Sequence, residues 1–145
     1  MSAYYEFDRS RWPLLVAYAP PGLVPDDEVR RFVREIGGEL ALGEPIALVL
    51  DARHAFLSAN QRTILATGAR RNANHFPGLL RATAIVVRTP IERAIVGALL
   101  WLYEPPYPIR SFTDLDDALA WARATLHAPS RRASAPDASL PPTPA

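Results

Sequence analysis

The chain alternates between short apolar runs and longer segments with helical periodicity. Residues 4–8 alternate in polarity and residues 14–19 are continuously apolar, with the polar stretch RSR between them. This pattern predicts two antiparallel strands joined by a hairpin turn. IALVLD at 46–51 and ATAIVV at 82–87 are unbroken apolar runs, typical of strands buried on both faces of a parallel sheet. Residues 110–112 predict one further short strand.

Four segments predict helices between and after these strands. The first begins at Pro25 ahead of three acidic residues, and the second runs from Ser58 to about residue 74. The third follows Pro90 and covers residues 91–103, and the fourth begins at Thr113 with acidic residues in its first turn. The first helix has one apolar face, formed by Val29, Phe32, Val33, Ile36 and Leu40.

The resulting order, ββαβαβαβα, predicts a single α/β domain over residues 1–128. Helices between strands favour a mostly parallel sheet of four to five strands with right-handed crossovers, and the first strand makes an antiparallel edge. Residues 129–145 contain five prolines and almost no large apolar residues. Such a segment cannot offset the entropy of ordering, so it is predicted to be a disordered tail.

Charge and composition narrow the classes of partner. All 16 basic residues are arginine, and up to Ala128 there are 14 arginines and 14 acidic residues. A balanced charge lacks the positive field of a nucleic-acid-binding protein. The chain has no cysteine, and its longest apolar stretch, AIVGALLWLY, is too short to span a bilayer. The first twelve residues contain acids and no apolar run, unlike an export signal. We therefore expect a cytoplasmic protein.

The residue types of a hydrolase triad occur together in Asp51, His54 and Ser58. They lie within eight positions of one loop, and no G-x-S-x-G elbow is present, so we expect no enzymatic activity. Asp51 is expected to end its strand by accepting hydrogen bonds from loop amides. His54, His75 and His127 are far apart and form no metal motif. Glycine-rich phosphate loops are also missing, so no cofactor is expected.

Ser58 begins the pattern S-x-x-Q with Gln61, which predicts a capping box. In this arrangement the serine oxygen accepts from the backbone N–H three residues on, and the glutamine reaches back. A cap of this kind stabilises a helix by about 1 kcal/mol. A phosphate at a helix N-terminus would also be electrostatically tolerated. The sequence is therefore compatible with both a capping role and phosphorylation of Ser58.

The helix over residues 91–103 carries more apolar residues than one buried face requires. One row is predicted to face the sheet: Ile91, Ala94, Ile95, Ala98, Leu99 and Leu102. A second row consists of Val96, Leu100 and Tyr103, with Trp101 beside it. A surface helix needs only one such row. The second row is covered by a neighbouring helix or the loop at 105–108, by another protein or a second copy, or by a small apolar ligand.

Four segments carry a resemblance to a known fold: IALVLDAR at 46–53, LSANQR at 57–62, ATAIVV at 82–87 and SFTDLDDALAW at 111–121. Together they resemble the SpoIIAA-like fold, particularly bacterial STAS/SEC14-type domain proteins. The resemblance implies a docking domain. Anti-sigma antagonists of this type bind a kinase around the helix after the LD strand and are released by phosphorylation at its start, whereas lipid-carrying relatives enclose an apolar ligand. The usual D-S-[ST]-G run is SANQ here, which puts Ala59 at the phosphoacceptor position.

Together these observations predict a non-enzymatic, cytoplasmic regulatory or scaffold domain in a signalling pathway. It would act by protein–protein contact, with another protein or a second copy as partner. The predicted contact residues are Ser58, Asn60, Val96, Leu100, Trp101, Tyr103 and Tyr107. The alternative is a domain that binds a lipid-like ligand between the 91–103 helix and the sheet.

Overall fold

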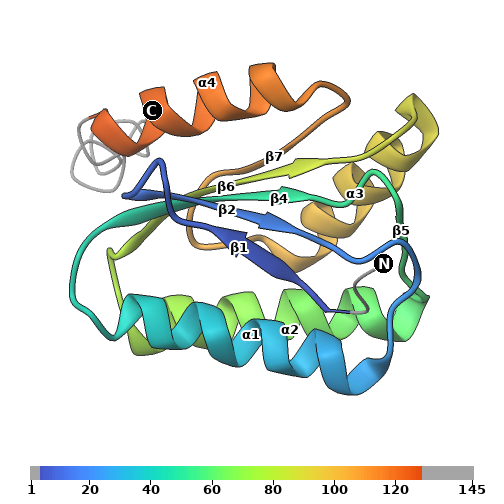
Figure 1. The fold of residues 1–145 in the computed structure, drawn as a ribbon, viewed down its shortest axis with the longest axis horizontal. Helices are drawn as coiled ribbons and strands as arrows, with labels where there is room; N and C mark the ends of the chain where they lie inside the picture. Colours follow the sequence, from blue (N-terminus) through green and yellow to red (C-terminus); the bar gives the residue numbers. More distant parts are fainter. Residues whose placement is uncertain (1–3, 129–145) are drawn as a thin grey trace, which may run out of the picture.

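A computed structural model describes residues 4–128, which fold around a five-stranded sheet in the order β1-β2-β4-β6-β7 (Figure 1). Its strands are β1 (Glu6–Asp8), β2 (Leu14–Tyr18), β4 (Ile46–Asp51), β6 (Leu80–Val86) and β7 (Ile109–Phe112). β1 pairs with β2 in antiparallel orientation, and the other neighbouring strands are parallel. The predicted architecture, a mostly parallel sheet with an antiparallel N-terminal edge, is confirmed.

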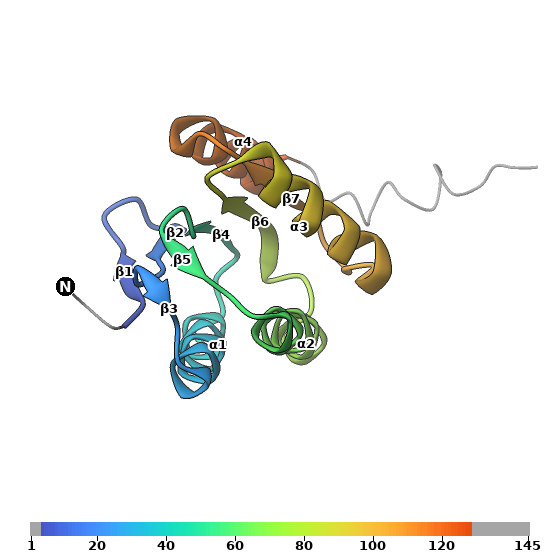
Figure 2. The ribbon, with the colours of Figure 1, turned by 90° about the vertical axis from the view of Figure 1, so that its right-hand side faces the viewer.

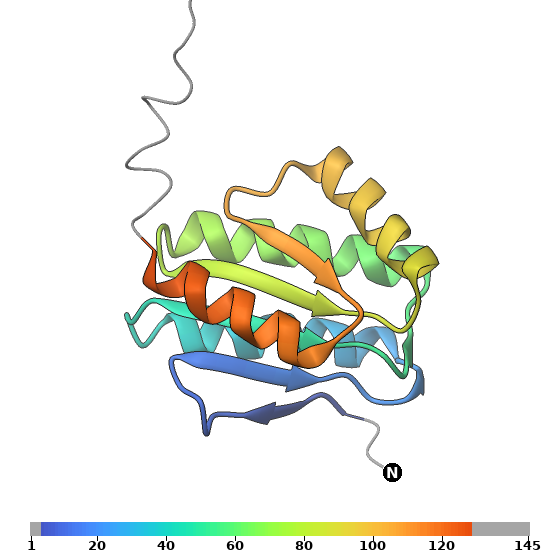
Figure 3. The ribbon, with the colours of Figure 1, turned by 90° about the horizontal axis from the view of Figure 1, so that it is seen from above.

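Helices lie on both faces of this sheet and beside one edge. α1 (Asp26–Leu40) and α2 (Ala59–His75) cover one face, and α4 (Leu115–His127) covers the other (Figure 2). α3 (Pro90–Tyr103) lies beyond β7, so it flanks the edge of the sheet (Figure 3). Within the described residues no helix has both the length and the apolar character needed to cross a membrane.

The unbroken apolar run of β4 is explained by its position at the centre of the sheet. All six of its residues are buried, and successive side chains point to opposite faces. Ile46 and Leu48 belong to the apolar cluster that packs under α1. Ala47 and Val49 belong to the cluster that packs under α4. Both faces of the strand are therefore core, as the sequence predicts.

The apolar face predicted for α1 is also confirmed, and it brings α1 against α2. Val29, Phe32, Ile36 and Leu40 are buried, whereas Val33 is half-buried and lies against Gly68 of α2. The side chain of Asn72 donates a hydrogen bond from Nδ2 to the carbonyl oxygen of Val33, at 3.2 Å. The two helices are thus in close contact along the middle of α2.

Two elements differ from the prediction. β3 (Gly22–Leu23) and β5 (Ala55–Phe56) pair in parallel as a separate small sheet. Two-residue strands are too short to show any periodicity, so the sequence contained no signal for them. The last helix begins later than expected, because its N-cap is Asp114 and not Thr113. The side chain of Asp114 accepts from the backbone N–H of Asp117 at 3.0 Å. The tail predicted for residues 129–145 lies outside the described residues.

Candidate functional site

An apolar cavity of about 310 Å³ lies between α2, α3 and the sheet. Side chains from α1, β4 and β6 form its floor, including Phe32, Leu48 and Ile85. Its walls come from the two helices: Leu65, Ala66 and Ala69 of α2, and Val96, Leu99 and Leu100 of α3. Phe56 of β5 and Ile95 of α3 also line it and are partly exposed, so they lie at the mouth. The volume lies near the lower end of the range of small-molecule pockets, which begins at about 300 Å³.

The orientation predicted for α3 is wrong. Of the row expected to face the sheet, Ile91, Ala94, Ile95 and Ala98 are exposed and Leu99 is half-buried. The side chain of Leu102 lies outside the described part of the chain. Val96 and Leu100, from the second row, are half-buried and line the cavity together with Leu99. The helix is apolar on nearly every side, so its periodicity did not select one face. Its position beyond the edge of the sheet decides which row is covered.

Among the other predicted contact residues of this region, Trp101 and Tyr107 have different environments. Trp101 is 82% exposed and lies on the outer side of α3. Tyr107 is half-buried and lines the cavity. The side chain of Tyr103 lies outside the part of the chain that the structure describes. The predicted contact residues are therefore divided between the cavity wall and the outer surface.

A few polar side chains interrupt the apolar lining of the cavity. The hydroxyl groups of Thr83 and Tyr107 are 3.5 Å apart. Burial raises the pKa of Tyr107, and the hydrogen bond with Thr83 offsets this only in part, so Tyr107 stays protonated at neutral pH. Arg62 is half-buried and donates from Nη1 to the carbonyl oxygen of Leu57 at 2.8 Å. Glu92 is the acidic group of the lining.

Ser58 forms the predicted capping box at the start of α2. Its Oγ accepts from the backbone N–H of Gln61 at 3.1 Å, and Oε1 of Gln61 accepts from the backbone N–H of Ser58 at 3.0 Å. Nε2 of Gln61 also donates to the carbonyl oxygen of Val24 and to Asp26, which ties α2 to the start of α1. Ser58 and Asn60 are both exposed.

The three triad residue types do not form a triad. Asp51 is buried, and both of its oxygens are used by Arg53: Oδ1 accepts from the backbone N–H and from Nε, and Oδ2 accepts from Nη2 at 2.7 Å. Burial raises the pKa of Asp51, but these bonds outweigh it, so the net pKa is lowered. Ser58 is engaged in its cap, and His54 is exposed. The loop amide bond expected for Asp51 is confirmed, whereas its ion pair with Arg53 was not foreseen.

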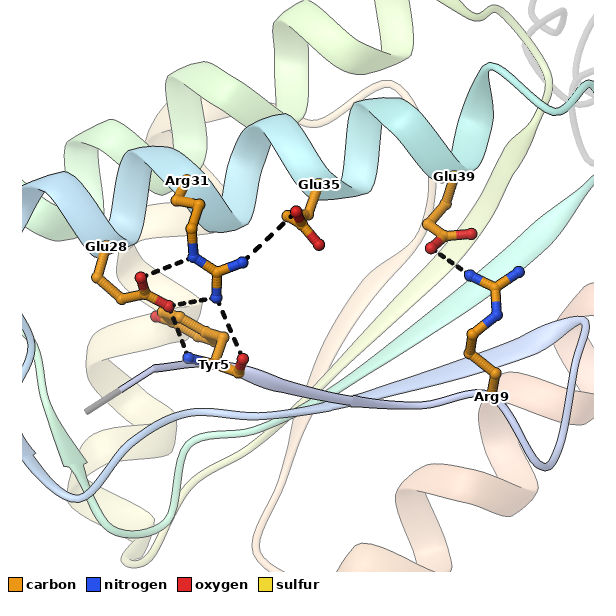
Figure 4. A network of polar contacts seen from close by, with 6 residues as sticks. All are labelled: Tyr5, Arg9, Glu28, Arg31, Glu35 and Glu39. Atoms are coloured by element: carbon orange, nitrogen blue, oxygen red, sulfur yellow. Dashed lines mark hydrogen bonds and ion pairs between the residues drawn. The ribbon is translucent and has the colours of Figure 1, made fainter. Parts of the chain in front are cut away.

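A second buried carboxylate joins the N-terminal segment to α1 (Figure 4). Glu28 accepts from the backbone N–H of Tyr5 at 2.7 Å and forms a two-pronged ion pair with Arg31, with N···O distances of 2.8 and 2.6 Å. The hydrogen bonds from Arg31 lower the pKa of Glu28, partly against the effect of burial. Arg31 also pairs with Glu35 at 3.5 Å. Every partner here belongs to the chain itself, so the network holds the fold together.

Within residues 4–128, no group of three or more side chains could hold a metal ion.

An exposed apolar pair that the sequence did not predict lies on the small sheet. Leu23 is 76% exposed and Phe56 is 64% exposed, and the two residues are register partners in β3 and β5. Short strands carry no periodic signal, so only the fold brings these side chains together. Phe56 also belongs to the mouth of the cavity.

Comparison with protein families gives a match over residues 50–126, more than half of the chain, to DUF7793, a domain of unknown function. The chain belongs to this family. The matched part of the DUF7793 chain begins in β4 and ends in α4, so it includes α2, α3 and most of the cavity lining. No curated protein matches the chain.

Solved structures similar to this DUF7793 chain share its fold. An uncharacterised DUF3478 protein with a SpoIIAA-like fold from Shewanella loihica has a TM-score of 0.58 and 19% identity, over 81% of this chain and 91% of that one. An anti-sigma factor antagonist from Mycobacterium paratuberculosis has a TM-score of 0.56 and 21% identity, over 85% and 97%. Unphosphorylated SpoIIAA, also an anti-sigma factor antagonist, has a TM-score of 0.57 and 13% identity, over 82% and 97%. The SpoIIAA-like fold implied by the sequence resemblance is confirmed.

Proposed function

We propose that this DUF7793 protein is a non-enzymatic regulatory domain that acts by contact with another protein. The observation that carries the proposal is the outer face of α3, formed by Ile91, Ala94, Ile95, Ala98 and Trp101. Ile91 is 74% exposed and Trp101 is 82% exposed. At about 100° per residue these five positions fall within one side of the helix. Exposed apolar patches of this kind mark interaction surfaces, and tryptophan is enriched among the residues that dominate binding.

The solved structures with the same fold support a protein partner over a second copy. Two of them are anti-sigma factor antagonists, a name that describes action on another regulatory protein. The exposed helix start at Ser58 and Asn60 and the exposed pair Leu23 and Phe56 are further candidate contact points. Ser58 already caps α2 with its hydroxyl group, so a regulatory phosphate on Ser58 would replace this hydroxyl cap.

Site-specific photo-crosslinking in the native cell tests this proposal. A photoreactive amino acid at Ile91 should give one discrete product containing a single partner protein. The same residue placed at Arg123, an exposed position of α4 outside the apolar face of α3, is the control. Trp101→Ala should abolish the product from position 91 and weaken binding of the purified partner by at least about tenfold. Equal products from both positions, or none from position 91, would count against the proposal.

The cavity supports a second candidate function, the binding of a small apolar ligand. Its walls are mostly aliphatic, and α3 has no buried residue among those whose side chains are described, so the wall on that side is loosely packed. Protein interiors are normally packed without such gaps. One water molecule occupies about 30 Å³ in the liquid, so a cavity of this volume has room for on the order of ten non-hydrogen atoms.

Native mass spectrometry of the protein purified from its own host tests this second function. An added mass that corresponds to a small apolar molecule is expected, and Ala69→Trp, which places a large side chain in the cavity, should remove it. Ala120→Trp, at an exposed position of α4, is the matched control. The same added mass in both variants would show that the molecule binds elsewhere.

A further inference from the structure

We propose that Arg62 makes the cavity selective for a short alkyl chain that ends in a carboxylate. This inference deepens the second candidate function and rests on it. The observation behind it is the order of side chains along the cavity face of α2. Arg62 stands first, Leu65, Ala66 and Ala69 follow, and Asn72 is last. These spacings of three and four place all five on one face of the helix.

The cavity wall on α2 is therefore polar at its two ends and apolar between them. Arg62 and Asn72 are ten residues apart, which corresponds to about 15 Å along the helix. The two ends differ in what they offer a ligand. The Asn72 side chain already donates to the carbonyl oxygen of Val33. The Nη1 of Arg62 donates to the carbonyl oxygen of Leu57, the residue that follows Phe56, and this bond holds the guanidinium beside the segment after β5.

The guanidinium of Arg62 retains unused hydrogen-bonding capacity. It has five N–H donors, of which the structure engages one. No carboxylate among residues 4–128 forms an ion pair with it, in contrast to Arg31 and Arg53. A half-buried arginine with free donors at the end of an apolar cavity matches a carboxylate, because the planar fork binds both oxygens at once.

The acidic residue of the lining is Glu92, which belongs to the wall formed by α3, and one of its carboxylate oxygens is engaged in a helix cap. Oε1 of Glu92 accepts from the backbone N–H of Arg88 at 2.8 Å and of Thr89 at 3.0 Å. It lies in the first turn of α3, where the helix dipole stabilises a negative charge. Glu92 thus completes the cap of α3 and forms no ion pair with Arg62. Arg62 remains as the cationic group of the lining, and charge complementarity selects an anionic head group.

Calorimetric titration with two probes of equal chain length tests this selectivity. Decanoic acid at pH 8, where it is ionised, and 1-decanol differ only in the head group. The wild-type protein should bind decanoate about tenfold more tightly than decanol, since a hydrogen bond to a charged group contributes more than a neutral one. In Arg62→Met, which keeps a long apolar stem, this preference should disappear while decanol binding is unchanged. Arg70→Met, an exposed arginine of the same helix, should behave as the wild type.

The outcomes distinguish the binding of an apolar ligand by the cavity from the selectivity that Arg62 adds. If neither probe binds the wild-type protein, both the selectivity and the ligand-binding function are refuted. If both probes bind equally well, or if Arg62→Met leaves the preference for decanoate unchanged, only the role of Arg62 is refuted. Arg62→Lys keeps the charge and loses the planar fork, so an intermediate preference is expected. Circular dichroism spectra that match the wild type show that each variant is folded.

Discussion

The contact between α1 and α2 at Gly68 allows a sharp test of the fold around the cavity. A Cβ atom added to Gly68 would lie 2.5 Å from Cγ1 and 2.7 Å from Cγ2 of Val33. Valine in a helix has essentially one rotamer, so it cannot turn away easily. Either the helices separate or Val33 is strained, at a cost of about 1–3 kcal/mol. Alanine also gains about 1 kcal/mol of helix propensity over glycine. Gly68→Ala should therefore destabilise the protein by about 1 kcal/mol.

Gly38 of α1 provides the matched control, because a Cβ added there meets no atom within 4 Å. Gly38→Ala should stabilise the protein by about 0.5–1 kcal/mol. The free energy of unfolding falls by about 1–3 kcal/mol for each 1 M of urea, so the two variants should shift the unfolding midpoint in opposite directions by about 0.5 M each. In a Val33→Ala background Gly68→Ala should become neutral or stabilising, since the obstructing methyl groups are gone. A Gly68→Ala variant as stable as Gly38→Ala would refute the close approach of α1 and α2.

Three further predictions concern the polar contacts of the fold. Ser58→Ala should lower the free energy of unfolding by about 1 kcal/mol, while Ser58→Asp, which still caps, should not. Arg53→Met leaves Asp51 buried without its partner, so it should cost about 1–3 kcal/mol at pH 7 and less in acid, where Asp51 is protonated. Glu28→Gln should reduce the loss of unfolding free energy that the wild-type protein shows as the pH falls from 7 to 3. Arg31 lowers the pKa of Glu28, so its contribution is present above the pKa of unfolded glutamate, about 4.3, and is lost as pH falls through the lower folded pKa. Urea midpoints at pH 7 and pH 3 measure all three effects.

The elements that the sequence predicted are those whose periodicity admits one arrangement. β4 is apolar at every position, which only a strand with core on both sides requires. α1 has a single apolar face and that face is buried. The capping box at Ser58 was equally clear, because all of its partners lie within four residues. In each case the local pattern and the tertiary environment demand the same structure.

The rest of the site depends on contacts between distant segments. Most of the α3 row expected to face the sheet is exposed, because both rows are apolar and no local rule ranks them. The register pair Leu23 and Phe56 comes from two strands too short to recognise. Arg62 belongs to the cavity only because α2 turns that face toward α3. None of these features leaves a periodic trace in the sequence.

The position of α3 follows from how the two faces of the sheet are already filled. The apolar cluster under α4 includes three small residues of the sheet, Ala47, Ala82 and Ala84, and two of the helix, Ala118 and Ala122, beside larger ones such as Val49. Small residues on both sides allow a close approach of the helix to the sheet. The opposite face carries α1 and α2. α3 is therefore left at the β7 edge, where a helix meets the sheet only along its side. One apolar side of α3 then lines the cavity and another side faces outward, so the same displacement that creates the cavity also creates the exposed face.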